Sequence, residues 1–175
     1  HQRRVLNTAL QWDAQGRLSV RTFLWGEMKK SGKTFVAACL ALWWAFVTSH
    51  TEIIIAANDL EQSVGRVFHT IAKLLEHNPA LGLSAKVRAS DIALTNGTTI
   101  TAIASDYKGA AGSRHSLVVF DELWGYSLEA AKRLYEELTP PPTEDHAWAL
   151  IVTYAGWTGE SVLLERLYKQ GLAGA

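Results

Sequence analysis

Cysteine is nearly absent: Cys39 is the single one among 175 residues, which excludes an internal disulfide framework and a cysteine-rich metal site. Because Cys39 lies in an apolar run, we expect a buried, inert thiol and a reducing environment. The six histidines show no paired ligand spacing, so we expect no zinc site. No signal-peptide pattern occurs, and the apolar run at 35–47 is too short to span a bilayer, so we expect no membrane partner.

An excess of charge of either sign is also missing. The formal net charge at pH 7 is zero, which argues against a domain that binds nucleic acid tightly by itself. The charges are nevertheless uneven, because residues 1–34 contain seven lysines and arginines against two acids, an excess of five positive charges. This asymmetry predicts a site for an anionic ligand near the start of the chain.

Strand-like and helix-like segments alternate along the chain, without an internal repeat or a low-complexity linker. Apolar runs predict strands at 17–25, 52–57, 116–122 and 147–156, and a hairpin at 91–105 that turns at Asn96-Gly97. Helical periodicity predicts helices at 34–47, 58–79, 127–138 and 160–171, the last ending at Gly171. The alternation predicts one α/β domain, a three-layer sandwich around a mostly parallel central sheet.

The stretch GEMKKSGKT at 26–34 contains most of a phosphate-binding loop. The Walker A pattern is G-x-x-x-x-G-K-[ST]; Gly32, Lys33 and Thr34 match it, whereas Glu27 replaces the first glycine. We expect Lys33 to reach the β- and γ-phosphates of ATP and the Thr34 hydroxyl to bind Mg²⁺, provided that Glu27 or Met28 fits the start of the loop. The alternative is a turn with exposed lysines before a core helix.

The stretch LVVFDE at 117–122 has the composition of a Walker B motif, a buried strand closed by two acids. We expect Asp121 to hold Mg²⁺ through its water shell and Glu122 to polarise the attacking water. For the acids alone, a solvated strand end is the alternative. The two motifs in this order within one α/β domain predict a P-loop NTPase of the RecA-like (ASCE) class that uses ATP and Mg²⁺.

Several segments resemble, in order, the N-terminal packaging ATPase domain of tailed-phage large terminases. MKKSGKT resembles the variant phosphate loop of that family, which commonly lacks the first glycine and has a basic residue, here Lys29, three places before the second. HQRRVL resembles the adenine-contacting segment and would make Gln2 the adenine reader. IIIAANDLEQSVGRVF, VVFDELWGY and IVTYAG resemble the strand–loop–helix, acidic and coupling segments. The resemblance implies nucleotide-binding residues Gln2, Glu27, Met28, Lys29, Lys30, Ser31, Gly32, Lys33 and Thr34, and coupling residues Thr153, Tyr154, Ala155 and Gly156.

By this resemblance the domain would couple Mg·ATP hydrolysis to translocation of double-stranded DNA into a viral capsid. Such domains form homo-oligomeric rings, commonly of five subunits, on a portal protein, and work with a small terminase subunit in the host cytoplasm. The acidic metal cluster of the family's C-terminal nuclease domain does not occur in residues 1–175, so we expect no DNA cleavage by this chain. We also expect these residues to be one domain of a longer protein.

A ring motor of this kind needs a positive charge from a neighbouring subunit at the transferring phosphate. The resemblance offers two candidates before the acidic strand, Arg114 in GSRHSL and Lys108 in YKG; solvated loop charges are the alternative, which we favour for Lys108. Lys29 is expected either to sense the γ-phosphate in its own subunit or to neutralise the loop.

Two other functions stay open at this point. A superfamily-2-like helicase or other DNA-remodelling ATPase shares this core, but it needs a second RecA-like domain, for which 175 residues leave no room. A nucleotide-gated assembly module would bind ATP without hydrolysing it, but such a module has no need of Glu122.

Overall fold

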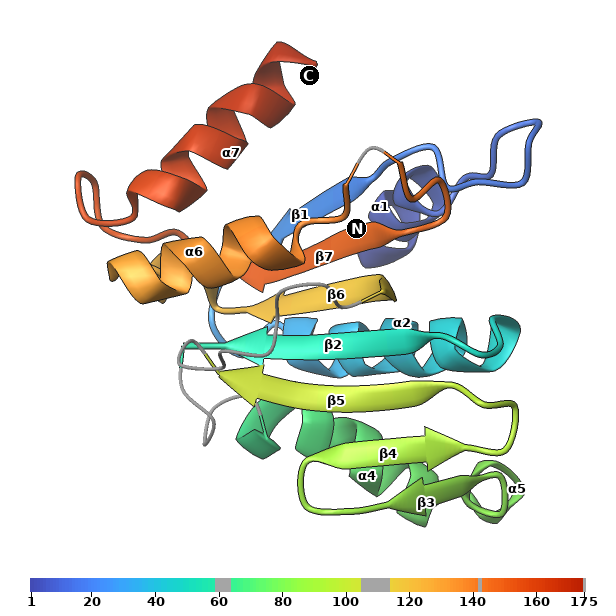
Figure 1. Ribbon diagram of the computed structural model, residues 1–175. Helices are drawn as coiled ribbons and strands as arrows, with labels where there is room; N and C mark the ends of the chain where they lie inside the picture. The colour runs from blue at the N-terminus through green and yellow to red at the C-terminus, as the bar shows by residue number, and fades with distance from the viewer. Residues whose placement is uncertain (59–63, 105–113, 142, 175) are drawn as a thin grey trace.

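The computed structural model describes residues 1–58, 64–104, 114–141 and 143–174. These residues form three layers, with a seven-stranded sheet between two layers of helices (Figure 1). The strand order is β1-β7-β6-β2-β5-β4-β3. The three-layer α/β sandwich predicted from the alternation of elements is therefore confirmed.

Five neighbouring strands are parallel, and two short strands extend the sheet at one edge. The parallel strands, in spatial order, are β1 (Thr22–Gly26), β7 (Trp148–Thr153), β6 (His115–Asp121), β2 (Glu52–Ala57) and β5 (Thr99–Ala104). Of the two short strands, β4 (Asp91–Leu94) runs antiparallel to β5, and β3 (Ala85–Val87) runs antiparallel to β4. β4 joins β5 through the predicted hairpin turn, in which Gly97 has a φ of 81°. The carboxyl ends of the five parallel strands all lie along the same side of the sheet, across the strand direction (Figure 1). We call this side the carboxyl edge; it is the usual place for a ligand in such sheets.

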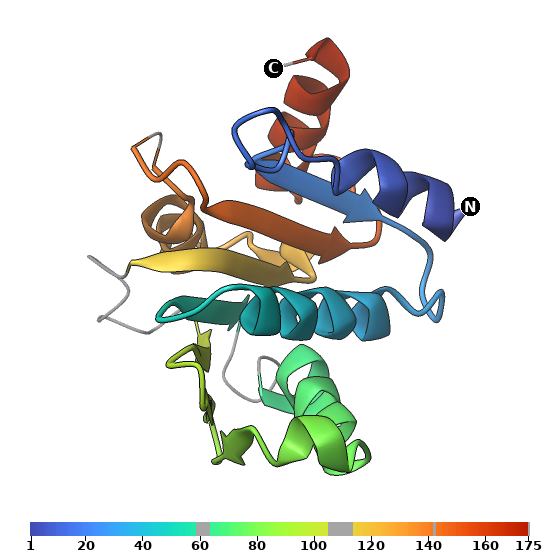
Figure 2. The same cartoon turned by 90° about the vertical axis from the view of Figure 1, so that its right-hand side faces the viewer.

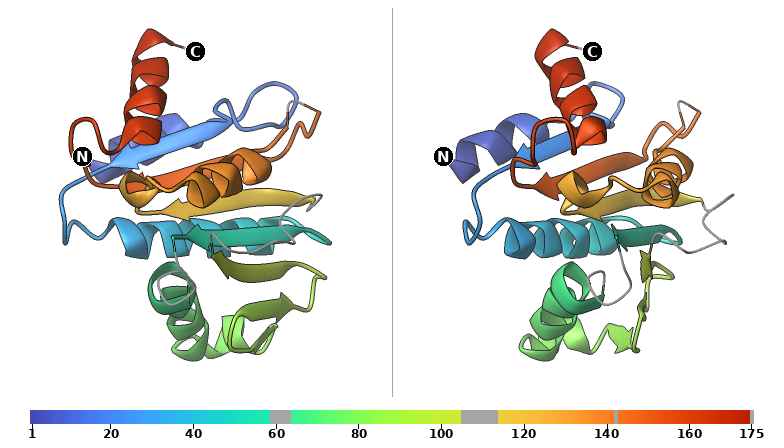
Figure 3. Two further views of the ribbon diagram at one scale, coloured as in Figure 1. Left: turned by 60° about the vertical axis from the view of Figure 1, so that its left-hand side comes forward. Right: turned by 90° about the vertical axis from the view of Figure 1, so that its left-hand side faces the viewer.

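Helices cover both faces of the sheet and enclose two apolar cores (Figures 2 and 3). One face carries α1 (Gln2–Ala9), α2 (Lys33–Val47), the π-helical segment η1 (Val64–Phe68) and α4 (His69–Glu76). The other face carries the 3₁₀ turn η2 (Leu123–Gly125), α6 (Glu129–Leu138) and α7 (Val162–Ala173). Because successive strand side chains point to opposite faces, Ile53 and Ile55 join the first core and Ile54 joins the second. Burial on both faces explains why the central strands are continuous apolar runs.

The strand predicted at 17–25 is wrong over its first half, because the chain turns back before β1 begins. Asp13 Oδ1 accepts a hydrogen bond from the backbone N–H of Arg17 at 2.9 Å, and Leu18 pairs with Trp12 in an isolated antiparallel bridge. This turn uses residues that the alternating pattern had assigned to the strand.

Two helices also differ from expectation. The helix predicted at 58–79 is described from residue 64 onward, as η1 and α4, and the short α5 (Pro79–Gly82) follows it. Gly171 does not stop the last helix, because α7 continues to Ala173 and Gly174, with a φ of 77°, takes the left-handed position after it. The sequence analysis did not predict α1, α5 or β3. None of the helices described here is long and apolar enough to cross a membrane.

Candidate active site

Residues 27–32 form the loop that links β1 to α2 at the carboxyl edge of the sheet. The backbone is left-handed at Lys30 (φ 64°) and at Gly32 (φ 89°), but not at Glu27. An ordinary side chain is therefore tolerated at Glu27, which removes the steric reason for a glycine at the first loop position. A Cβ atom added to Gly32 would contact nothing within 4 Å, so crowding does not require glycine there. The left-handed backbone conformation is what favours glycine at this position.

Lys33 and Thr34 stand in the first turn of α2, where backbone N–H groups lack helical partners and the helix dipole is positive. Lys33 is only 5% exposed, and its Nζ lies 3.3 Å from Oε1 of Glu122. This ion pair joins the loop to the residue that follows β6. The structure thus brings the phosphate-loop lysine and the second acid of the sequence motifs together.

Asp121 is the last residue of β6 and is 1% exposed. Neither of its carboxylate oxygens has a hydrogen-bond partner in the described part of the chain. Burial, followed by the charge of Glu122, raises the pKa of Asp121 from 3.8 to about 6, although the charges of Arg66 and Lys33 act in the opposite direction. Buried carboxylate oxygens of this kind fit a hard cation such as Mg²⁺, and Thr34 lines the adjacent cavity.

Glu122 ends the strand in a left-handed conformation, with φ 55° and ψ 53°. In a continuing strand, the side chains of residues 121 and 122 would point to opposite faces of the sheet. The left-handed turn, held by a 2.8 Å hydrogen bond from Glu122 N–H to Val152 O, lets Glu122 face Lys33 instead. Non-glycine residues in this conformation are uncommon and cluster at functional sites.

The end of β7 lies between the loop and the acid pair, because β7 is the strand between β1 and β6. Thr153 O accepts a hydrogen bond from Glu27 N–H at 3.1 Å, and Thr153 Oγ1 accepts one from Trp124 N–H at 3.2 Å. The centroid of the Tyr154 ring lies 4.6 Å from Nζ of Lys29 and 5.4 Å from Nζ of Lys33. The predicted coupling segment therefore touches both halves of the site.

The other end of the coupling segment faces α7. Ala155 and Gly156 line a second cavity of about 1010 Å³ between the loop and α7. A Cβ atom on Gly156 would lie 1.8 Å from Ser161 Oγ, so this position has no room for a side chain. Ser161 Oγ in turn donates a 2.9 Å hydrogen bond to Trp124 O, which ties the start of α7 to the segment after the acids.

Gln2 lies against the loop at 27–32. Its Nε2 donates hydrogen bonds to Ser31 O at 3.0 Å and to Glu27 Oε2 at 3.3 Å. Burial raises the pKa of Glu27, but the nearby polar groups of Ser31, Trp25 and Gln2 outweigh it, so that the pKa is below its ordinary value. The carboxylate in the place of the first glycine thus joins α1 to the loop. Met28 and Lys30, also predicted to bind nucleotide, are exposed on the loop.

Arg114 stands at the opposite end of β6 from the acid pair and is exposed. The seven residues of β6 span roughly 23 Å at about 3.3 Å per residue, so Arg114 does not reach the acids of its own subunit. Its action in a neighbouring subunit stays a prediction. The rival candidate, Lys108, lies outside the described residues.

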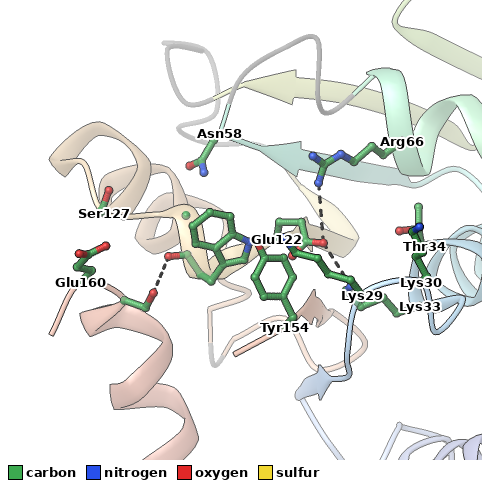
Figure 4. Close-up of a pocket in the computed structure, with 13 residues that line it drawn as sticks. Lys29, Lys30, Lys33, Thr34, Asn58, Arg66, Glu122, Ser127, Tyr154 and Glu160 are labelled. Carbon is green, nitrogen blue, oxygen red and sulfur yellow. Dashed lines mark hydrogen bonds and ion pairs between the residues drawn. The ribbon is translucent and has the colours of Figure 1, made fainter. Parts of the chain in front are cut away.

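A cavity of about 570 Å³ lies between the loop and Glu122 (Figure 4). Arg66, which the sequence analysis missed, forms part of its wall, and its guanidinium NH1 lies 3.9 Å from Glu122 Oε1. No sequence motif marks this position, although Arg66 is the only lysine or arginine between Lys33 and Lys73. The lining residues also include Lys29, Lys30, Lys33, Thr34, Asn58, Glu122 and Tyr154.

No family model and no curated protein matches the sequence, but solved structures do match the fold. The large terminase of bacteriophage HK97 superposes with a TM-score of 0.72 at 19% identity, over 92% of this chain and 34% of that chain. The large terminase ATPase domain of Thermus phage P74-26 superposes with a TM-score of 0.52 at 18% identity, over 79% of this chain and 61% of that one. The fold is that of a large terminase ATPase domain.

A third match is the large terminase of a thermophilic bacteriophage in complex with ADP, with a TM-score of 0.54 at 11% identity. That match covers 75% of this chain and 33% of the other, so the terminase-fold domain spans about a third of the longer terminases it matches. The P-loop NTPase fold predicted from the two motifs is confirmed. At 11% to 19% identity, these neighbours establish the fold alone.

Proposed function

We propose that this terminase-fold domain binds and hydrolyses Mg·ATP and acts as the motor of a viral DNA-packaging terminase. The observation that carries the proposal is the 3.3 Å contact between Lys33 Nζ and Glu122 Oε1 at a cavity that Thr34 also lines. A cation for the phosphates and an acid for the water thus belong to one site, as phosphoryl transfer to water requires. The neighbour crystallised with ADP supports a nucleotide as the ligand.

In the proposed reaction, the backbone N–H groups at the start of α2 and the Lys33 ammonium bind the β- and γ-phosphates. Thr34 and Asp121 would hold Mg²⁺, which supplies charge neutralisation on the phosphates when it is bound. The phosphate oxygens replace Glu122 as the partners of Lys33. Glu122 then turns to orient the attacking water with Oε2, an oxygen that is buried before nucleotide binds and has no hydrogen-bond partner among the described residues.

The proposed link from hydrolysis to movement is residues 153–156. Thr153 O is bonded to the backbone of Glu27, and the Tyr154 ring lies beside Lys29 and Lys33. A change in the contacts of either lysine with phosphate therefore acts directly on the end of β7. Lys29 is the proposed γ-phosphate sensor on this path.

The proposed assembly is a homo-oligomeric ring, commonly of five subunits, that holds double-stranded DNA on a portal protein, with a small terminase subunit as a further partner. Arg114, exposed at the far end of β6, would act in the site of the neighbouring subunit. The structural neighbours, which are phage large terminases, support this setting in the infected host cell.

The test is ATP hydrolysis measured against protein concentration, with and without double-stranded DNA, for the wild type and Glu122→Gln. Turnover per subunit should rise with concentration and with DNA, whereas Glu122→Gln should bind ATP and lose turnover because glutamine carries no charge to polarise the water. Glu136→Gln, an exposed position on α6, is the matched control. Failure of the wild type to bind ATP would refute the nucleotide site, and binding without turnover at every concentration would favour the assembly module.

A further inference from the structure

Glu122 has two cationic neighbours, and the proposed function requires one of them to leave. Lys33 Nζ lies 3.3 Å and Arg66 NH1 3.9 Å from the same oxygen, Oε1, and the two approach it from different sides (Figure 4). When Lys33 binds phosphate oxygens, its ammonium no longer pairs with the Glu122 carboxylate. Glu122 is only 8% exposed, and a carboxylate buried to this extent without a charged partner is strongly disfavoured.

We infer that Arg66 is the residue that holds the Glu122 carboxylate in place for water activation once nucleotide has engaged Lys33. The inference rests on the proposed ATPase function and adds to it a positioning residue from the same subunit. Arg66 pairs with Oε1, whereas Oε2 is buried and no described residue engages it; a turn of the carboxylate about its contact with Arg66 would present this second oxygen to the attacking water. This division of the two oxygens is what a water-orienting glutamate needs.

The backbone around Arg66 supports this role. Arg66 is the middle residue of η1, a π-helical segment. Such segments are rare in proteins, and those that occur often lie at functional sites. The next two residues, Val67 and Phe68, are fully buried in the core beneath α2, which fixes the direction from which the arginine leaves the helix. Its side chain is 45% exposed and lines the cavity, so it reaches the site without being locked inside the core.

The chemistry of the side chain also fits. A guanidinium has five N–H donors in a plane, so it can hold a carboxylate oxygen and still offer donors to a second acceptor such as a phosphate oxygen. A lysine at this position would supply the charge but not the fixed direction. Because Arg66 lies 3.9 Å from Glu122 of its own chain, its effect belongs to each subunit by itself, unlike that proposed for Arg114.

The experiment compares steady-state ATP hydrolysis and equilibrium ATP binding for the wild type, Arg66→Ala and Arg66→Lys over a range of protein concentrations. Arg66→Ala should lower kcat by about 100-fold, the effect of misplacing a reacting group by roughly 1 Å, with ATP affinity within about threefold of wild type. The loss should be equal in dilute and concentrated protein, and Arg66→Lys should recover part of it. Arg88→Ala, an exposed arginine paired with Asp91 far along the sheet, is the matched control and should behave as wild type.

A single-turnover measurement over long times, which detects the slow residual hydrolysis left in Glu122→Gln after steady-state turnover is lost, separates positioning from a general loss of structure. If Arg66 acts through Glu122, adding Arg66→Ala to Glu122→Gln should cause little further loss, whereas independent effects would multiply. An unchanged kcat in Arg66→Ala, a loss confined to ATP affinity, or a loss seen only at high protein concentration would overturn the inference. If the wild type itself neither binds nor hydrolyses ATP, the proposed function fails first and the inference falls with it.

Discussion

Replacement of Asp121 by asparagine should stabilise the metal-free domain, although it removes the proposed Mg²⁺ ligand. The carboxylate is 1% exposed, has no hydrogen-bond partner among the described residues and lies beside Glu122. Its pKa rises from 3.8 to about 6 on folding, a difference of about two units, and each unit corresponds to about 1.4 kcal/mol. The ionised carboxylate therefore destabilises the folded chain by about 3 kcal/mol, which asparagine relieves.

The sign of this effect fixes its pH dependence. The folded protein binds the Asp121 proton more tightly than the unfolded chain, so wild-type stability falls as pH rises from 3.8 to about 6. Asparagine does not titrate in this range. The advantage of Asp121→Asn should therefore be about 3 kcal/mol at pH 7.5, about 1 kcal/mol at pH 4.5, and nearly absent below pH 3.8.

The free energy of unfolding of the wild type and of Asp121→Asn is measured by urea unfolding at pH 7.5 and at about pH 4.5. Tryptophan fluorescence follows the transition, with a chelator present and nucleotide absent. Asp145→Asn is the control, because Asp145 is exposed and its ion pair with Arg17 is long, at 3.9 Å; its effect should stay within about 0.5 kcal/mol. An equal gain for Asp121→Asn at both pH values, or none at pH 7.5, would refute the reasoning from the buried charge.

Three further substitutions test other parts of the site. Lys33→Ala should weaken ATP binding by roughly 10- to 100-fold, measured by equilibrium titration with a fluorescent ATP analogue, because a charge-assisted hydrogen bond contributes about 1.5–3 kcal/mol; unchanged affinity would remove Lys33 from the phosphates. Arg114→Ala should spare binding and lower hydrolysis by about 10³-fold or more only at concentrations where subunits assemble; an equal loss in the dilute monomer would contradict a role in the neighbour's site. Glu27→Gly restores the Walker A glycine but removes the contact with Gln2, so thermal melting should show a loss of about 1 kcal/mol; equal or higher stability would show that this contact contributes nothing.

The sequence was sufficient to predict that the loop and the acids share a site. Both motifs follow strands, and the carboxyl ends of parallel strands meet at one edge of a sheet, so Lys33 and Glu122 had to lie near one another. For the missing first glycine the sequence supplied only a condition, that Glu27 or Met28 fits the start of the loop; the structure answers it, since the positive φ angles occur at Lys30 and Gly32 and not at Glu27. These predictions depend only on local motifs and on the class of sheet.

Other features depend on contacts between distant segments, which local patterns do not encode. The place of β7 between β1 and β6 is set by strand pairing across more than a hundred residues. Arg66 reaches Glu122 because η1 packs beneath α2, a tertiary contact without a motif. The first half of the expected strand at 17–25 failed for the opposite reason, because local turn chemistry at Asp13 overrides an alternating pattern.

Two adjacent carbonyl groups of β7 fasten the two halves of the site: Val152 O receives the Glu122 N–H, and Thr153 O receives the Glu27 N–H. A pull on the chain beyond Thr153 would therefore strain Glu122, the proposed water-activating acid, and the loop at 27–32, the proposed nucleotide loop, together. Free-energy coupling between two sites is reciprocal, so if bound nucleotide shifts β7, an opposing mechanical load on β7 changes nucleotide affinity by the same free energy. A motor built on this strand would therefore bind nucleotide with one affinity when it moves without load and with a different affinity when it stalls against an opposing force.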